Sequence, residues 1–124
     1  MRTPNYLLLS VREPKASAEL YNQLLGCAPV EFQDTFVLYV LAGGLKIGLW
    51  RDADIQPEPK PAGGIEVSFS ETSRAALLAT YAEWKNLGMK VLQEPAQMDF
   101  GFTFVASDPD GHRFRAFVLN DTPR

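Results

Sequence analysis

The same order of predicted elements occurs twice in this chain of 124 residues. Each half begins with an apolar strand, continues into a helix that ends in Leu-Gly, and finishes with three strand-like segments. The first half covers residues 1–52 and the second covers residues 63–124. A repeat with a period of roughly sixty residues restricts the fold strongly, because each half must bury one face of a small sheet beneath a single helix.

In the first half, a helix is predicted directly after the strand "YLLLSVRE". Pro14 suits the first helical position and Gly26 suits the residue that ends a helix. Apolar side chains return at helical spacing between them, at Leu20, Tyr21, Leu24 and Leu25. The segments "PVEF", "TFVLYVLA" and "LKIGLW" are then predicted to be strands.

Residues 53–62, "ADIQPEPKPA", hold three prolines in five positions and predict an extended linker. The second half then repeats the order, with "GIEVSFS" as a strand and "SRAALLATYAEWKNLG" as a helix that places Leu77, Tyr81 and Trp84 on one face. The segments "KVLQ", "FTFVASD" and "HRFRAFVL" complete it as strands. The chain is therefore predicted to be one α+β domain built from two βαβββ modules.

Alternation along the strands divides their residues between two faces. The face toward the helix takes the apolar set, for example Leu9, Ile47 and Phe114. The opposite face takes a mixed set of aromatic, polar and charged residues: Tyr6, Lys46, Gly48, Trp50, Glu66, Ser68, Arg113, Arg115 and Phe117. Such a mixture is typical of a concave cavity with stacking walls and a few polar groups that orient a ligand.

Other interpretations of this face stay open. It is also compatible with an ordinary solvated sheet surface, with Trp50 as a packing or dimer-interface residue and Arg115 as an ion-pair partner of Glu66. The alternation does not settle whether Phe36 or Tyr39 belongs to it, nor Phe102 or Phe104. His112, the only histidine, is assigned to the helix side and is expected to bond locally at a turn.

Charge and cysteine content exclude several kinds of partner. The formal net charge of −3 and the absence of a Lys/Arg run argue against binding to nucleic acid or to an anionic membrane. A single cysteine, Cys27, cannot form an internal disulfide, and the first apolar run is too short for a signal peptide or a membrane span. We therefore expect a cytoplasmic protein.

The turn "DPDG" before the strand "HRFRAF", together with "LYNQLLG" and the block "VLQEPAQMDFGFTFVASDPDG", resembles the vicinal oxygen chelate superfamily of glyoxalases, bleomycin-resistance proteins and extradiol dioxygenases. The resemblance covers nearly the whole chain. It implies that the two modules form a curved half-barrel with the helices outside, and that the protein is a homodimer. The Pro-rich linker is long enough to permit exchange of modules between chains, and the sequence leaves open whether that exchange occurs.

In the metal-dependent members of that superfamily, four His or Glu side chains hold a divalent ion. The resemblance places these positions at Tyr6, near Gly48, within residues 64–66 and at Arg115. A guanidinium has no lone pair to give and carries a positive charge, so Arg115 is incompatible with that ion. Glu66 alone does not make a site, and we expect no metal and no other cofactor.

The resemblance is nearest to metal-free resistance proteins of the phenazine type, in which a tryptophan stands at the place of Trp50. It implies binding and sequestration of a planar aromatic small molecule, while the question of turnover stays open. Arg115, with Lys46 or Arg113, favours an anionic group on that ligand. The residues expected to contact this ligand are Trp50, Arg115, Tyr6, Glu66, Ser68, Lys46, Phe117, Phe102 and Phe104. The alternatives are a metal-dependent lyase, isomerase or dioxygenase, and a scaffold that acts only as a dimeric interaction domain.

Overall fold

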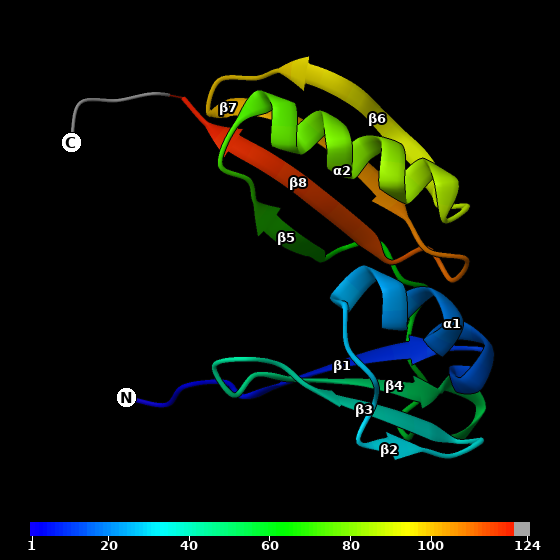
Figure 1. The fold of residues 1–124 in the computed structure, drawn as a ribbon. Helices are drawn as coiled ribbons and strands as arrows, with labels where there is room; N and C mark the ends of the chain where they lie inside the picture. The colour runs from blue at the N-terminus through cyan, green and yellow to red at the C-terminus, as the bar shows by residue number, and fades with distance from the viewer. Residues whose placement is uncertain (121–124) are drawn as a thin grey trace. The chain divides into compact units, whose positions relative to one another are not determined.

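The computed structural model describes residues 1–120 of the chain. It is an α+β structure with two four-stranded sheets, and neither sheet closes into a barrel (Figure 1). The chain divides into two compact units, Met1–Pro61 and Ala62–Arg124, called unit 1 and unit 2 below. Each unit has its own sheet, its own helix and its own core.

The two units have the same topology. Unit 1 contains β1 (Tyr6–Val11), α1 (Pro14–Leu25), β2 (Glu31–Phe32), β3 (Phe36–Val40), β4 (Lys46–Arg51) and a 3-10 turn η1 (Asp52–Asp54). Unit 2 contains β5 (Glu66–Ser70), α2 (Arg74–Asn86), β6 (Lys90–Gln97), β7 (Gly101–Ser107) and β8 (Arg113–Leu119). The strand orders are β1-β4-β3-β2 and β5-β8-β7-β6, with the first pair parallel and the others antiparallel. The repeated element order predicted from the sequence is therefore confirmed.

The helix of unit 1 begins and ends where the sequence predicts. Pro14 is its first residue, and Gly26 ends it with a left-handed φ of 69° that side chains other than glycine rarely adopt. Tyr21 of this helix is fully buried. The Tyr39 hydroxyl donates to Asn22 Oδ1 at 2.6 Å, which places Tyr39 on the helix side of the sheet. Burial raises the pKa of Tyr39 to about 12, so this donor keeps its proton.

The helix of unit 2 covers one face of its sheet across β8 and β7 (Figure 1). Ser73 caps its first turn, because the Ser73 hydroxyl accepts from the Ala76 amide at 3.0 Å. Trp84 is 4% exposed and meets the rings of Phe69, Phe104 and Phe114 edge-on, with centroids 5.1 to 6.3 Å away. This aromatic cluster is the centre of the unit 2 core.

Several predicted strands differ from the structure in length, and "TFVLYVLA" for example is a strand only over Phe36–Val40. The segment "PVEF" contributes only Glu31–Phe32, whereas the strand that begins at "KVLQ" continues to Gln97. The longer strand β6 includes Pro95, which is tolerated because β6 lies at the edge of its sheet. Two register shifts interrupt its pairing with β7.

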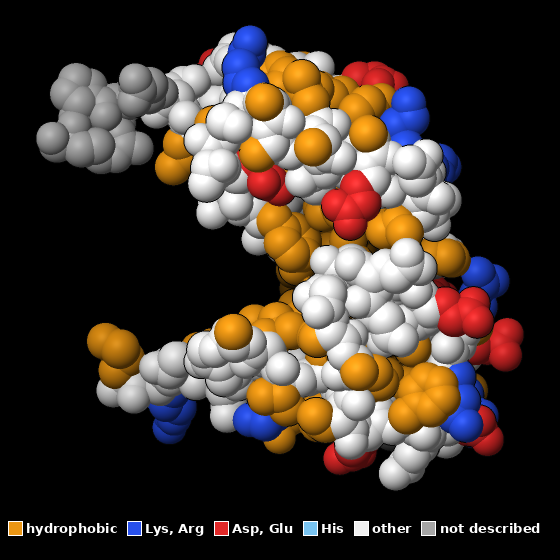
Figure 2. Space-filling model, in the orientation of Figure 1, with side chains coloured by type: hydrophobic (Ala, Val, Ile, Leu, Met, Phe, Trp, Pro, Cys, Tyr) orange, Lys and Arg blue, Asp and Glu red, His pale blue; other side chains and the backbone are white. Residues whose placement is uncertain are grey.

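Neither helix in residues 1–120 is long and apolar enough to span a lipid bilayer. On the face of the molecule seen in Figure 2, the Lys and Arg side chains are scattered among acidic and uncharged groups.

Candidate functional site

Each sheet has a face opposite its own helix, which we call the helix-distal face. In unit 2 this face includes Glu66 and Ser68 of β5, Thr103 of β7, and Arg113, Arg115 and Phe117 of β8. Between β5 and β8, Glu66 is the cross-strand partner of Arg113 and Ser68 is that of Arg115, and between β7 and β8 Thr103 is the partner of Phe117. The alternation of residues in the sequence predicts this placement for both arginines, for Glu66 and for Phe117.

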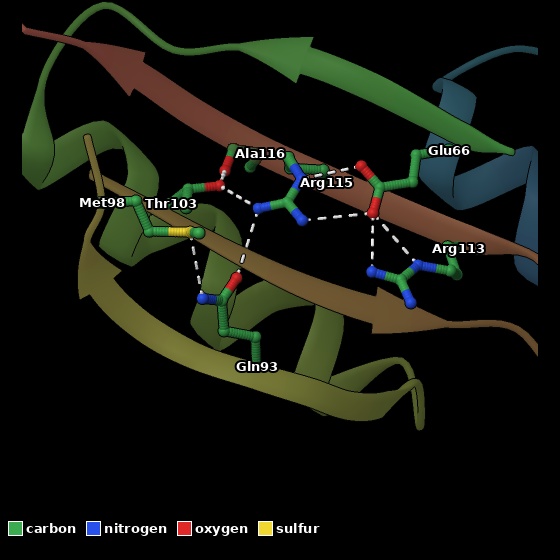
Figure 3. A network of polar contacts seen from close by, with 7 residues as sticks. All are labelled: Glu66, Gln93, Met98, Thr103, Arg113, Arg115 and Ala116. Atoms are coloured by element: carbon green, nitrogen blue, oxygen red, sulfur yellow. Dashed lines mark hydrogen bonds and ion pairs between the residues drawn. The ribbon is translucent and has the colours of Figure 1, made fainter. Parts of the chain in front are cut away.

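Arg115 is the centre of a polar network on this face (Figure 3). Its Nε and Nη2 donate to the two oxygens of Glu66 at 2.8 and 3.1 Å. Its Nη1 donates to Gln93 Oε1 at 3.2 Å and to Thr103 Oγ1 at 3.1 Å. The Thr103 hydroxyl donates in turn to the Ala116 carbonyl at 2.7 Å, so it is free to accept from Arg115. The guanidinium is therefore fixed from three strands.

Arg113 binds the same carboxylate from the other side. Its Nε and Nη2 both donate to Glu66 Oε2, at 3.0 and 2.7 Å (Figure 3). The Arg115 hydrogen bond, followed by that from Arg113, lowers the pKa of Glu66 despite the opposing effect of burial. Glu66 is therefore ionised at neutral pH, and the cluster of two guanidiniums and one carboxylate has a net charge of +1.

Aromatic and sulfur groups border this cluster. Phe100 and Phe117 form an edge-on pair with centroids 6.5 Å apart, and the Arg115 guanidinium carbon is 6.0 Å from the Phe100 ring. The Met98 sulfur accepts from Gln93 Nε2 at 3.3 Å, so Gln93 joins the sulfur to Arg115 (Figure 3). The helix-distal face of unit 2 therefore carries both aromatic rings and a net positive charge.

The helix-distal face of unit 1 is more apolar. Tyr6 and Lys46 are cross-strand partners, and the Lys46 ammonium lies 5.0 Å from the centre of the Tyr6 ring. Trp50 is half-buried and pairs with Phe36 of β3 on the same face. The structure thereby answers the question left open between Phe36 and Tyr39, since Tyr39 points toward α1.

Phe104 was wrongly expected to contact a ligand. Its ring is fully buried on the helix side of unit 2, where it packs edge-on against Tyr81 and Trp84. Phe102 lies on the same side of β7 as Phe104, so it too is absent from the helix-distal face. The Arg74 guanidinium stacks 4.0 Å from the Phe102 ring, and both line a separate cavity of about 280 Å³.

Three residues of the unit 2 face were missed, namely Gln93, Thr103 and Phe100. Thr103 could have been found by counting through the "DPDG" turn. Because Ser107 pairs with Arg113, successive pairs place Thr103 opposite Phe117, and direct partners share a face. Gln93 and Phe100 had no such signal, since register shifts interrupt β6 and Phe100 lies between strands.

His112 lies in the turn before β8, as expected. Its amide donates to Asp108 Oδ1 at 2.8 Å, and its carbonyl accepts from the Asp108 amide at 3.0 Å. The Asp108 carboxylate also accepts from the Asp110 amide, which closes the turn. The backbone of His112 therefore bonds locally.

The four positions at which the superfamily resemblance implies metal ligands do not supply a suitable donor set. Tyr6 faces a cation, Gly48 has no side chain, and Arg115 is itself a cation. The Glu66 carboxylate is already bonded to two guanidiniums. Within residues 1–120, no group of three or more His, Cys, Asp or Glu side chains is placed to hold an ion. These residues do not fit a divalent metal.

The fold defines a class of protein with two βαβββ units, and each sheet of this chain presents polar and aromatic residues on the face opposite its helix. The model of the glyoxalase/bleomycin resistance protein/dioxygenase superfamily matches residues 3–116. The chain belongs to this superfamily, which confirms the resemblance seen in the sequence.

Among individual proteins, the chain is similar to the phenazine antibiotic resistance protein EhpR of Enterobacter agglomerans, with 26% identity over 121 residues, which are 95% of this chain and 93% of that protein. A protein of Agrobacterium tumefaciens, whose structure was solved in solution by NMR, is 43% identical to this chain, and the two structures superpose with a TM-score of 0.90. The match covers 98% of this chain and 100% of that protein's chain. A glyoxalase-related enzyme from Fulvimarina pelagi has a TM-score of 0.84 at 18% identity, covering 95% and 88% of the two chains, and shares the fold.

Proposed function

We propose that this protein binds an aromatic, anionic small molecule without a metal, as a resistance-type binding protein. The observation that carries the proposal is the Glu66, Arg113 and Arg115 cluster, whose net charge of +1 lies beside the rings of Phe100 and Phe117. A carboxylate or phenolate complements that charge, and a flat ring system complements those side chains. The similarity to a phenazine antibiotic resistance protein supports the same chemistry.

Trp50 is the large aromatic residue that the proposal assigns to ring contact in unit 1. It is half-buried on the helix-distal face, whereas the other tryptophan, Trp84 of α2, is only 4% exposed. A bound aromatic ligand should therefore quench Trp50 more strongly than Trp84. The predicted homodimer and cytoplasmic location belong to the same proposal.

The first test is a fluorescence titration with phenazine-1-carboxylate. We expect quenching in the wild-type protein, and we expect Trp50→Ala to weaken the affinity roughly tenfold because a stacking surface is lost. The matched control is Phe32→Ala, since Phe32 is an exposed ring of the same unit that faces Lys15 of α1. Unchanged affinity in Trp50→Ala, or an equal loss in Phe32→Ala, contradicts the assignment of Trp50.

The metal-free part of the proposal has its own measurement. Protein treated with a chelator should bind phenazine-1-carboxylate with the same affinity as untreated protein, because no step of the proposed recognition uses an ion. Elemental analysis of the untreated protein accompanies the titration. A stoichiometric transition metal whose removal abolishes binding would show that the metal-dependent alternative is correct.

A further inference from the structure

The two arginines on the helix-distal face of unit 2 differ in how many donors they have left. A guanidinium has five N–H donors. Arg115 uses four of them on Glu66, Gln93 and Thr103. Both hydrogens of its Nη1 are engaged, so it has no complete edge to offer a second carboxylate. Its side chain is 16% exposed.

Arg113, in contrast, keeps most of its N–H donors unused by the groups that surround Arg115. It uses two of its five donors, Nε and Nη2, and both bond to Glu66 Oε2. The remaining three donors include one on each terminal nitrogen, which lie side by side in the spacing that matches the two oxygens of a carboxylate. The Arg113 side chain is 36% exposed, more than twice the exposed fraction of Arg115.

We infer that Arg113 is the residue that recognises the anionic group of the ligand, and that Arg115 is a positioning residue that acts through Glu66. This inference rests on the proposed function and narrows its ligand class to aromatic carboxylates. Glu66 holds the Nε–Nη2 edge of Arg113, so the adjacent Nη1–Nη2 edge is presented in a fixed orientation. Gln93 and Thr103 hold Arg115, and Arg115 in turn holds Glu66.

The same strand supplies the surface for the ring. Arg113 and Phe117 lie four residues apart on one face of β8, a separation of about 13 Å at ~3.3 Å per residue. Arg115 lies between them in the strand, and the Phe100 ring is 6.0 Å from the Arg115 guanidinium carbon and 6.5 Å from the Phe117 ring. A carboxylate bound at Arg113 therefore directs its aromatic ring along β8 toward Phe117.

The experiment compares phenazine-1-carboxylate with phenazine-1-carboxamide by isothermal titration calorimetry, which does not depend on tryptophan. The two compounds share a ring and differ in charge. We expect the wild-type protein to prefer the carboxylate by roughly tenfold to a hundredfold, and Arg113→Gln to abolish that preference while leaving the carboxamide affinity within about twofold. Arg113→Lys keeps the charge without the fork and should restore part of the preference.

Two further variants separate recognition from positioning. Arg115→Lys should weaken the carboxylate more than the carboxamide, because Glu66 then holds Arg113 less firmly, but by less than Arg113→Gln does, and thermal melting checks that this variant is folded. The control variant Lys85→Gln removes one positive charge from α2 of unit 2, where Lys85 faces the Tyr81 ring, and should leave the preference intact. The inference is overturned if Arg113→Gln retains the preference, if Arg115→Lys removes it as completely as Arg113→Gln, or if Lys85→Gln removes it.

The wild-type result distinguishes this inference from the proposed function. Equal binding of carboxylate and carboxamide overturns the role of Arg113 and leaves a protein that binds neutral aromatic compounds. Binding of neither compound overturns the proposed function for phenazines, and the inference with it.

Discussion

The helix-distal faces of the two units can be compared residue by residue, because the strands of both sheets have the same order. In unit 1, Tyr6 of β1 is the direct partner of Lys46 of β4. In unit 2, Glu66 of β5 is the direct partner of Arg113 of β8. The same place in the fold therefore holds a cation above an exposed aromatic ring in one unit and an ion pair with two hydrogen bonds in the other.

The next position along the strand differs more. Gly48 follows Lys46 by two residues, as Arg115 follows Arg113. The side chains of Leu8 and Phe36 close over Gly48, and a Cβ built there would be 2.8 Å from both. One unit thus fills this position with apolar side chains from neighbouring strands, while the other fills it with a guanidinium. One repeated topology therefore presents an apolar surface in unit 1 and a charged surface in unit 2, because a few strand residues differ between them.

The largest effect on stability is expected from removing the Arg115 guanidinium of unit 2. Arg115→Leu leaves Thr103 and Gln93 without their donor and leaves Glu66 with one arginine instead of two. We expect the free energy of unfolding to fall by about 2–3 kcal/mol, measured by urea denaturation. The control is Lys46→Leu, which removes a cation from the apolar face and should cost less than about 0.5 kcal/mol. Equal losses in the two variants would contradict the difference between the faces.

A smaller effect is expected from filling the glycine position of unit 1. In Gly48→Ala the new methyl group meets Leu8 Cδ2 and the Phe36 ring, which must move aside. We expect a loss of about 1–2 kcal/mol in the free energy of unfolding. Gly64→Ala is the matched control, because a Cβ at Gly64 meets nothing within 4 Å. A Gly48→Ala protein as stable as Gly64→Ala would show that the apolar face of unit 1 is loosely packed.

Much of this organisation could be predicted from the sequence because it depends on local periodicity. The bounds of both helices follow from Pro14, Gly26 and Gly88, and the two faces of β1, β4, β5 and β8 follow from strict alternation. The placement of Arg115 opposite the helix follows from the same alternation. These features need no knowledge of how distant segments meet.

The rest of the site depends on pairing between strands. Phe104 was misplaced because the aromatic run "FGFTF" favours either face until the register with β8 is known. Gln93 reaches Arg115 only through an edge strand with two register shifts, which periodicity does not reveal. The division of donors between Arg113 and Arg115 depends on side-chain geometry, so no sequence pattern could have shown it.

The smallest effect concerns the acid sensitivity of unit 2. The pKa of Glu66 is lowered in the folded protein, chiefly by the Arg115 hydrogen bond. The ion pairs of Glu66 with Arg113 and Arg115 therefore stabilise the fold at pH values above the ordinary pKa of this carboxyl, about 4.5. That contribution is lost as the pH falls from this value through the lower folded pKa. We expect Glu66→Gln to cost about 1 kcal/mol at pH 6 and progressively less toward pH 3. Lys46→Met, which removes a cation that faces the Tyr6 ring, should show the same small difference at both pH values. Denaturant unfolding of the three proteins across this range measures both differences, and a Glu66→Gln difference that does not shrink in acid would contradict the ionised carboxylate between the two arginines.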